Sequence, residues 1–454
     1  MRKEDIAIIG IAVKLADIEE LSEYWECLAD KKHCNKELSN QRISDINKYM
    51  KYINKDPIHT FPKAAYLDRI DTFDYDYFNI PYHKAISIEP ANRLFMETAC
   101  QCLEEAGYTK ELMKNIKTGV FTGYGREPGY YEMFKVRHPD VRISYFAESF
   151  IASYMMHFYN LRGPILTINS SCSSSLAALH YACHSIRTNE CKMALAAGVQ
   201  IHYLPNDKQE IELLIENGQC KPFDQFAKGM GFGEGVCVIL LKRLEDAIKD
   251  QDHIYAVVKG SAVGSNGSAI GLYAPNPGAQ IETILSAWND AAINPRTITY
   301  IETHGSGTQL GDTIEFEAIN KAFRNSTKDN LFCAIGSVKS NLGHTGYCAG
   351  LASLIKAVLQ LNKKQIAGTV HFRKPNQNLN LKDSAIYINK ELSYWERYGN
   401  EKRRCGISSF GVSGTNCHVV LEEYDNVKIN NHLSKGISFK SKRCWPEFLD
   451  YNGR

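Results

Sequence analysis

The sequence contains no long apolar run and no strong excess of charge of one sign. A membrane-spanning helix needs about 18 or more consecutive apolar residues, and no stretch of the chain reaches that length. The N-terminal segment up to Leu21 has too short an apolar core and acidic flanks, which do not fit a secretory signal peptide. The formal net charge is +2, so the composition points neither to a nucleic acid nor to a membrane as a partner. We therefore expect a cytoplasmic protein.

The chain also lacks the cysteine spacings of metal-binding and redox motifs. It has 14 cysteines, but none forms a CxxC pair, and the closest spacing is Cys100-x-Cys102 on a predicted helix. Thiols of a cytosolic protein stay reduced, so we expect no disulfides. The neighbours Cys417 and His418 would point to opposite faces of a predicted strand, which supports no zinc site. A zinc protein is therefore disfavoured, and we expect no bound metal.

What the sequence does contain is an alternation of strands and helices. With 454 residues, 44% hydrophobic and 23% charged, it has an ordinary globular composition and a length that favours two subdomains. Short apolar runs predict buried strands at 6–13, 119–123, 165–169, 194–200, 236–243, 254–263, 298–304, 332–339 and 416–423. Helical spacing predicts helices at 19–30, 93–108, 175–186, 279–292 and 346–364. This alternation predicts an α/β fold.

A charged stretch near residues 244–253 divides the chain into two parts. We expect an N-terminal half over residues 1–245, a C-terminal half over 246–424 and a linker-like tail over 425–454. No repeat of residues between the halves is apparent. The polar stretch 31–65 is typical of a surface insertion, and the tail is typical of a segment laid over the surface.

The stretch NSSCSSSL, residues 169–176, places a single cysteine, Cys172, between a predicted strand and a predicted helix. A helix N-terminus carries about half a positive charge, which favours a thiolate and lowers the pKa of the cysteine. The neighbouring serines allow a tight turn and offer hydroxyls for capping. Taken alone, the stretch also fits an inert, buried cysteine.

Three later segments carry further polar groups at the ends of predicted elements. His304 ends a predicted strand before a glycine-rich turn, and Lys339 and His344 lie on a strand-to-helix connection. A glycine-rich turn over 410–416 precedes the last predicted strand. Alone, each is a weak signal, because such a histidine is more often structural and a lysine is usually solvated.

Together and in this order, these segments resemble the β-ketoacyl synthases of the thiolase superfamily, in particular the ketosynthase domains of modular polyketide synthases. The resemblance runs from about Ile6 to Glu423 and includes IEPANRLFMETACQCLEEAGY, GPILTINSSCSSSLAALHYA and GLYAPNPGAQ. It implies a thiolase-like fold, in which two similar αβαβα halves give a five-layered architecture. It also implies a homodimer, with the neighbours of the nucleophile segment near the interface. The implied partners are acyl carrier proteins that bear phosphopantetheine arms, and no cofactor is bound by the chain itself.

The resemblance assigns roles to single residues. Cys172 would accept an acyl chain from a carrier protein, and His304 and His344 would promote the loss of carbon dioxide from a malonyl extender. The resulting enolate would then attack the Cys172 thioester. Lys339 would keep this polar site in order, and a pairing of Lys339 with Glu315 is a hypothesis. A thiolate suits this chemistry because thioester exchange needs a nucleophile that works near neutral pH.

The resemblance also places an oxyanion hole and a gate. The backbone N–H groups of Cys172 and of the turn at Phe410 and Gly411 would hold the oxyanion, and the Phe410 ring would separate the acyl pocket from the extender. Candidates for structural support are Glu315, Asp312 and Thr308. Candidates for substrate binding are Thr303, Thr345, Asn341 and Tyr347, and conjectural selectivity positions are Tyr124, Arg126, Tyr130, Tyr131 and Tyr347.

Some positions depart from the usual family pattern. Asn169-Ser170-Ser171 stands where aspartate-threonine-alanine is common, and Ser306 stands where threonine is common. After His344 the usual acidic and alanine-rich residues are replaced by TGYCAG, which brings a bulky Tyr347, and Glu89 replaces an aspartate before Pro90. None of these changes removes a catalytic group, but they leave the choice of substrate open.

Two other interpretations within the fold remain. A transfer-only ketosynthase would load and pass on an acyl chain without extending it, but such variants often lose a histidine that this chain keeps. A non-catalytic partner subunit would generally lack the cysteine. The acyl length, the extender and the product stay open, as does the choice between a stand-alone enzyme and a domain of a larger synthase.

Overall fold

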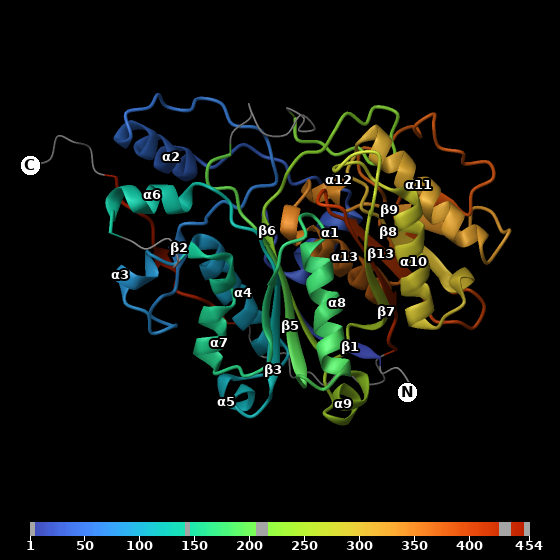
Figure 1. Ribbon diagram of the computed structural model, residues 1–454, viewed down its shortest axis with the longest axis horizontal. Helices are drawn as coiled ribbons and strands as arrows, with labels where there is room; N and C mark the ends of the chain where they lie inside the picture. Colours follow the sequence, from blue (N-terminus) through green and yellow to red (C-terminus); the bar gives the residue numbers. More distant parts are fainter. Residues whose placement is uncertain (1–4, 141–145, 206–216, 426–436, 449–454) are drawn as a thin grey trace, which may run out of the picture.

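The computed structural model describes residues 5–140, 146–205, 217–425 and 437–448. Its centre is an eleven-stranded sheet (Figure 1). From one edge to the other the strands are β11 (Ile386–Ile388), β9 (Cys333–Gly336), β8 (Ile298–Glu302), β13 (Arg404–Phe410), β14 (Thr415–Glu422), β7 (Ala256–Ser265), β1 (Ile6–Leu15), β6 (Gly235–Arg243), β5 (Met193–Gln200), β3 (Thr118–Gly123) and β4 (Ile165–Ile168).

This sheet consists of two halves with the same topology. The order β1-β6-β5-β3-β4 in one half corresponds to β7-β14-β13-β8-β9 in the other. In each half the first two pairs of strands are antiparallel and the next two are parallel. The halves join where Ile6–Ile8 of β1 pair with Ala256–Val258 of β7. The two halves share the order and directions of their strands but not their amino-acid sequence, so the sequence alone shows no repeat.

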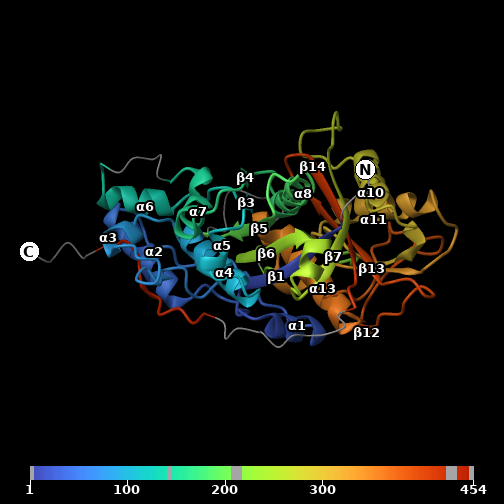
Figure 2. The ribbon, with the colours of Figure 1, turned by 90° about the horizontal axis from the view of Figure 1, so that it is seen from below.

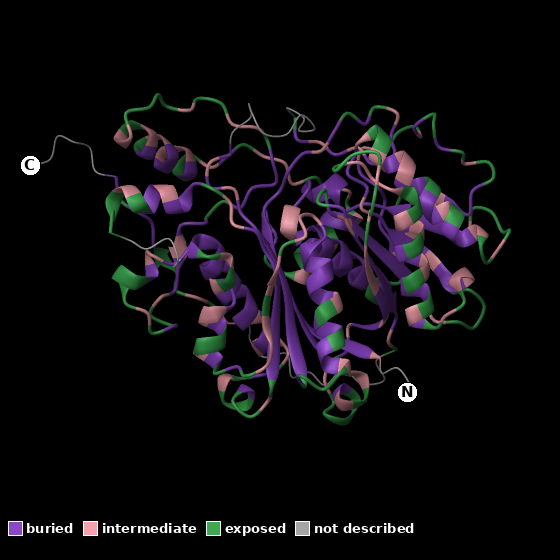
Figure 3. Cartoon of the chain, viewed as in Figure 1, coloured by how far each residue is buried: buried purple, intermediate pink, exposed green. Residues whose placement is uncertain are grey.

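Helices cover both faces of each half-sheet and give five layers (Figure 1). The outer helices are α4 (Pro90–Glu105) and α7 (Ser153–Tyr159) on the N-terminal half, and α10 (Pro277–Ala291) and α11 (Gln309–Arg324) on the C-terminal half. Between the two half-sheets lie α8 (Ser174–Arg187) and α13 (Ala349–Lys363). Every residue of α13 from Ala349 to Leu361 is buried, as expected for a helix enclosed on all sides (Figure 3). The architecture confirms the expected fold class.

The other described elements are short or peripheral. The helices are α1 (Leu21–Ala29), α2 (Asn40–Tyr52), α3 (Tyr82–Ala85), α5 (Lys110–Met113), α6 (Tyr130–Arg137), α9 (Leu244–Lys249) and α12 (Lys339–Leu342). The 3₁₀ turns are η2 (Glu148–Phe150), η3 (Pro295–Thr297) and η4 (Gly346–Cys348), and the short strands are β2 (Thr72–Phe73), β10 (Gln365–Ile366), β12 (Ser393–Tyr394) and β15 (Lys442–Arg443). Within the described ranges, no helix combines the length and the apolar character that a membrane span requires.

The stretch 31–65 is not the irregular insertion that its polarity suggested, because it contains α2. The buried face of α2 includes charged residues, and Arg42 forms a buried ion pair with Glu234. The two Arg42 nitrogens donate to the two carboxylate oxygens at 2.6 and 2.8 Å. A helix that buries an arginine has no simple apolar stripe, so the pattern of the sequence hides it.

The described part of the C-terminal tail lies partly over the surface, as expected, and partly in the core. Residues 426–436 and 449–454 lie outside the described ranges. Residues 437–448 run along the N-terminal half (Figure 2), and β15 pairs with β2. Residues 440–443 are exposed, whereas Cys444 and Trp445 are buried, and the Arg93 side chain donates to the Cys444 carbonyl. The end of the segment therefore anchors it in the hydrophobic core of that half.

Candidate active site

Cys172 lies in the turn between β4 and α8, at the centre of the five layers. Serine hydroxyls hold this turn, because Ser174 Oγ accepts the Ser170 N–H at 2.9 Å and donates to the Ser171 carbonyl at 2.6 Å. Ser171 has a positive φ of 55°, so the chain reverses sharply just before the cysteine. The turn thus presents the sulfur at the start of α8, as expected from the sequence.

Burial raises the pKa of the Cys172 thiol, contrary to the lowering expected from its place at a helix start. The positive charge of Lys339 and backbone hydrogen bonds from Val412 and Cys172 itself act in the opposite direction but are outweighed. A thiolate removed from water loses more solvation than the helix terminus returns. The expectation of a lowered pKa was therefore wrong for the free thiol of the folded chain.

This pKa direction predicts how the thiol reacts with pH. The rate of Cys172 alkylation by iodoacetamide should rise about tenfold per pH unit up to at least pH 8.5, the ordinary thiol value, because only the thiolate reacts. Peptide mass spectrometry of timed samples measures the rate at Cys172 alone. A rate that levels off below about pH 7.5 would mean that Lys339 and the helix terminus outweigh burial and lower the pKa of the Cys172 thiol.

A cavity of about 160 Å³ opens onto the sulfur. It is lined by Cys172, Met230, Asn266, Tyr273, Pro275, Gln280, His304, Ser306, Thr308, Gly311, Asp312, Glu315, His344, Phe410, Gly411, Val412 and Asn416. Six connections therefore meet here: β4 to α8, β5 to β6, β7 to α10, β8 to α11, β9 to α13, and β13 to β14. A side chain at Gly411 would meet the Ser170 carbonyl at 2.2 Å, so only glycine lets the β13–β14 turn approach the cysteine turn this closely.

The two imidazoles His304 and His344 face the cavity with their ring centroids 5.4 Å apart. His304 Nδ1 accepts the Phe410 N–H at 3.3 Å, and His344 Nδ1 accepts the Gly346 N–H at 3.0 Å. Burial and the charge of Lys339 hold the pKa of both rings well below its usual range, so both are neutral at pH 7. Because Nδ1 accepts, each neutral ring carries its proton on Nε2.

His344 Nε2 is buried without a hydrogen-bond partner. An unpaired buried N–H is costly, and it is usually satisfied by a ligand or by water. This nitrogen is therefore a donor available to an oxygen acceptor that enters the cavity.

Lys339 and Glu315 both hold the loop that carries His304. Lys339 Nζ donates to the His304 carbonyl at 2.5 Å. The Glu315 carboxylate accepts the N–H groups of His304 at 2.7 Å and Gly305 at 2.8 Å. No direct ion pair joins Lys339 and Glu315, because both side chains bind backbone groups of the same loop. Burial lowers the pKa of Lys339 and the charge of Glu315 raises it by less, so the expected pairing acts only at a distance.

Asp312 supports the next residues of that loop. It accepts the N–H of Gly307 at 3.1 Å and of Phe223 at 2.7 Å. Burial raises the pKa of Asp312 to about 7 and that of Glu315 to about 8. Thr308 lines the cavity, with its hydroxyl 3.1 Å from that of Ser306.

The remaining candidate residues differ in their surroundings. Thr303 donates to the Gly336 carbonyl at 2.8 Å and Asn341 to the Lys32 carbonyl at 2.8 Å, so both side chains bind the protein rather than face the cavity. Thr345 is buried and does not line the cavity. Tyr347 does not line the cavity either; its backbone N–H donates to Gln200 Oε1 at 3.2 Å, and its ring lies against the Gly125 backbone.

The aromatic selectivity candidates before the nucleophile are mostly engaged elsewhere. Tyr130 donates to the Ile86 carbonyl at 2.8 Å, and Tyr124 donates to the Glu89 carboxylate at 3.0 Å. Tyr131 is buried against Arg126, which stacks over its ring at 5.0 Å. None of these residues lines the cavity at Cys172.

Sequence reasoning missed several residues that line the cavity. Val412 belongs to the glycine-rich turn predicted over 410–416 and lines the cavity, but it was not singled out as a site residue. Asn416 donates to Asn266 at 2.8 Å, which joins the starts of β14 and of the loop after β7 at the cavity wall. Met230 and Gln280 also line the cavity, and no motif signals them.

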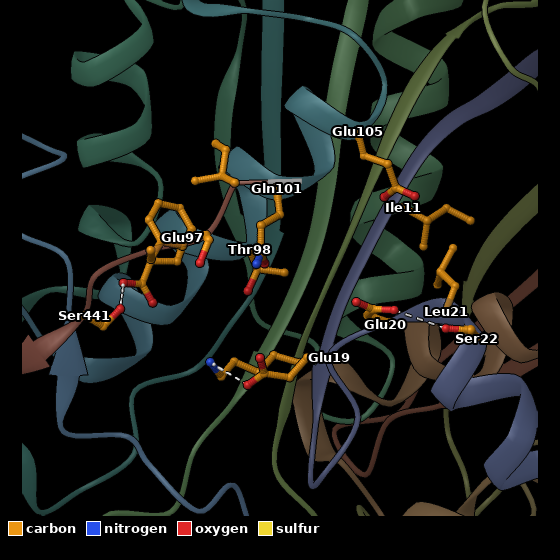
Figure 4. A pocket seen from close by; sticks show the side chains of 14 residues that line it. Ile11, Glu19, Glu20, Leu21, Ser22, Glu97, Thr98, Gln101, Glu105 and Ser441 are labelled. Atoms are coloured by element: carbon orange, nitrogen blue, oxygen red, sulfur yellow. Dashed lines mark hydrogen bonds and ion pairs between the residues drawn. The ribbon is translucent and has the colours of Figure 1, made fainter. Parts of the chain in front are cut away.

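A larger cavity of about 670 Å³ lies between β1, α4 and residues 437–441, away from all of these groups. Figure 4 shows its carboxylates Glu19, Glu20, Glu97 and Glu105. It contains no cysteine or histidine, so size alone does not identify the reactive site.

Three protein-family models match the chain. The β-ketoacyl synthase N-terminal domain matches residues 3–247, the C-terminal domain matches 255–373, and the ketoacyl-synthetase C-terminal extension matches 375–445. The last match reaches into the described tail segment and covers its residues 437–445.

Curated relatives are large polyketide synthases. Polyketide synthase PksL of Bacillus subtilis is 36% identical over 439 residues, which cover 96% of this chain and 10% of PksL. Polyketide synthase GfsE of Streptomyces halstedii is 35% identical over 432 residues, which cover 92% of this chain and 11% of GfsE. The chain thus spans about a tenth of the length of each of these two relatives.

Solved structures of single ketosynthases match over nearly the whole chain. The ketosynthase from module 6 of the Bacillus subtilis bacillaene synthase has a TM-score of 0.84 and 35% identity, covering 93% of this chain and 72% of that one. The oxazolomycin ketosynthase domain OzmH KS7 of Streptomyces albus has a TM-score of 0.84 and 29% identity, covering 94% of this chain and 75% of that one. The chain therefore belongs to the β-ketoacyl synthase family, among the ketosynthase domains of polyketide synthases.

Proposed function

We propose that the chain is an elongating ketosynthase, which loads an acyl chain onto Cys172 and extends it by decarboxylative condensation with a malonyl thioester. The observation that carries this proposal is the convergence of one sulfur and two neutral imidazoles on a single cavity, with His344 Nε2 unpaired. A transfer-only enzyme has no need of two N–H donors facing the extender side of the sulfur.

Loading is a thioester exchange. The Cys172 sulfur attacks the carbonyl of the incoming thioester, and the carrier thiol leaves with a proton. The tetrahedral oxyanion needs fixed donors. The N–H groups of Phe410 and Gly411, expected for this role, donate instead to His304 Nδ1 and to the Thr415 carbonyl, so the backbone N–H groups of Cys172 and Val412 are the proposed donors. Loss of one such donor typically costs about 3 kcal/mol of transition-state stabilisation.

Extension begins with the malonyl group in the cavity. The bond to the carboxylate breaks, carbon dioxide leaves, and the electron pair forms an enolate whose negative oxygen is held by the Nε2–H groups of His304 and His344. The enolate carbon then attacks the thioester carbonyl on Cys172, and the sulfur leaves as the new carbon–carbon bond forms. Lys339, Glu315 and Asp312 keep the His304 loop in place during these steps.

Phe410 suits a gating role between the two steps. Its ring lies 5.8 Å from that of His304, and its backbone N–H is bonded to the same imidazole. Movement of this ring would open the cavity to the extender once the sulfur is loaded. The partners are then acyl carrier proteins, whose phosphopantetheine arms reach the sulfur; the chain itself holds no cofactor in this reaction.

A two-stage experiment tests the proposal against its alternatives. The protein is first incubated with an acyl carrier thioester, and the Cys172 adduct is measured by intact mass; malonyl carrier is then added, and carbon dioxide and the extended product are measured. Adduct and product together support elongation. Adduct without product supports a transfer-only ketosynthase, and no adduct supports a non-catalytic partner subunit.

A homodimer is part of the proposal, and β4 is the strand that supports it. β4 is the last strand of the sheet next to the nucleophile turn, and it pairs only with β3 among the described strands. Its Leu166 is 48% exposed. An exposed apolar edge strand is a template for pairing with another chain. We propose that β4 pairs with β4 of a second copy.

Leu166→Lys should therefore weaken the dimer by about 100-fold or more, because two lysines would face each other across the new pair. Light scattering after size exclusion should show the mass fall to the 51.2 kDa of one chain at micromolar concentration. Leu331→Lys is the matched control, because Leu331 is 51% exposed at the opposite end of the sheet. An unchanged mass for Leu166→Lys contradicts this interface.

A further inference from the structure

Gln280 adds a polar group to the Cys172 cavity that the proposed chemistry does not use. Its side chain lines this cavity, and the residue is only 2% exposed. Its Oε1 is buried and has no hydrogen-bond partner among the residues that the structure describes. A buried carbonyl oxygen without a partner is costly, and it is usually satisfied by a ligand or by water. Gln280 therefore offers an acceptor in the same cavity in which His344 offers a donor.

The start of α10 holds Gln280 in place. Asn276 caps this helix, because its side chain accepts the N–H groups of Gly278 at 3.0 Å and Ala279 at 3.3 Å. The Gln280 N–H donates to the Asn276 carbonyl at 3.0 Å. Asn276 Nδ2 in turn donates at 2.8 Å to the carbonyl of Asn266, which also lines the cavity. The backbone of Gln280 is therefore fixed relative to the cavity wall.

The cavity opens to the surface beside Tyr273 and Val412, two lining residues that are 73% and 54% exposed. A carrier protein is far too large for a cavity of about 160 Å³, so only its phosphopantetheine arm can enter. In that arm a short ethylene link separates the thioester sulfur from the nearest amide. An amide N–H therefore enters the cavity together with the thioester that reacts with Cys172.

We propose that Gln280 Oε1 accepts the N–H of this amide and so positions the carrier thioester for attack by Cys172. The inference rests on the proposed loading of Cys172. Other parts of the substrates fit this oxygen less well, because a carbonyl oxygen repels a malonyl carboxylate and a plain alkyl chain has no donor. The amide is the same in every carrier-bound substrate. Gln280 therefore recognises the arm of the carrier rather than a particular acyl chain.

The test replaces one N–H of the substrate by an oxygen. Butanoyl thioesters of N-acetylcysteamine, which keeps the amide of the arm, and of 2-acetoxyethanethiol, which has an ester in its place, are offered separately. Cys172 acylation is followed by intact mass, and each rate is divided by that of the same thioester with glutathione, which removes differences in intrinsic reactivity. The natural chain should load from the amide about tenfold faster, the usual worth of one hydrogen bond. In Gln280→Met this ratio should fall to about one, while the rate from the ester stays within about threefold.

Gln101→Met is the matched control, because Gln101 lines the larger cavity away from Cys172; its ratio should stay at the natural value. A retained rate from the ester shows that Gln280→Met still folds and loads. Equal rates for the two thioesters in the natural chain overturn the inference and leave the proposed function standing. A natural ratio in Gln280→Met does the same, whether or not both rates fall together. No acylation of Cys172 by either thioester overturns both.

Discussion

Replacement of Cys172 by alanine is expected to abolish acyl loading, with a loss of about 10⁴-fold or more in rate, because no other group takes over a covalent step. The sulfur lies where the loops of His304, His344 and Phe410 meet around the described cavity. The measurement is the mass of the intact protein after incubation with an acyl carrier thioester. The acyl increment should be absent, and no extended product should form.

Cys34→Ala provides a close control. Among the cysteines only Cys34 and Cys172 are half-buried, and the others are buried. Cys34 lies 3.6 Å from Cys27 and does not line the cavity. This variant should load at the natural rate. An adduct that persists in Cys172→Ala and disappears in Cys34→Ala would show that Cys34, and not Cys172, carries the acyl group.

The layers of the fold could be predicted from the sequence because they depend on short, strongly apolar runs. The strands β1, β5 and β6 are buried along nearly their whole length. Runs of valine, isoleucine and leucine show this directly in β1 and β6, and a continuous run of smaller apolar residues shows it in β5. α2 could not be found in this way, because its buried face contains Arg42 and Asp45. β13 was also missed, because it contains glycine and serines and is buried by long-range pairing with β8 and β14.

The sequence predicted which residues meet at the cavity better than it predicted their hydrogen-bond partners. Cys172, His304 and His344 were expected to meet, and their side chains line one cavity. The partners of Lys339 and Glu315 were not predictable, because both bind backbone groups whose positions depend on the loop after β8. The direction of the Cys172 pKa shift was not predictable either. The helix start, which lowers the pKa, can be recognised in the local sequence, whereas the burial that raises it depends on how the whole chain packs.

The second large expected effect is a loss of decarboxylation when His344, with its unpaired buried Nε2, is replaced. His344→Ala should leave Cys172 acylation within about threefold of the natural rate but lower the decarboxylation of malonyl carrier by about 100- to 1000-fold, the usual cost of one oxyanion donor. Loading and carbon dioxide release are measured separately, the first by intact mass and the second with a carboxyl-labelled malonyl group. His304→Ala should give the same separation. His202→Ala is the control, because His202 lies close enough to influence His344 but does not line the cavity.

The same geometry sets the pH dependence of that step. Because the pKa of both imidazoles lies well below its usual range, the rings stay neutral as the pH falls from 8 to 6, and carbon dioxide release should not drop across the ordinary histidine pKa of about 6.5. A protonated ring would lose its Nδ1 acceptor and with it the bond from Gly346 or Phe410 that aims Nε2–H at the cavity. Asp312 and Glu315, with a pKa of about 7 and about 8, also titrate in this range, so the profile is compared with that of Asp312→Asn. A fall in release centred near pH 6.5 that persists in this variant, with loading intact, would mean that the two rings are solvated rather than buried. Their N–H groups would then be too weakly fixed to hold an enolate.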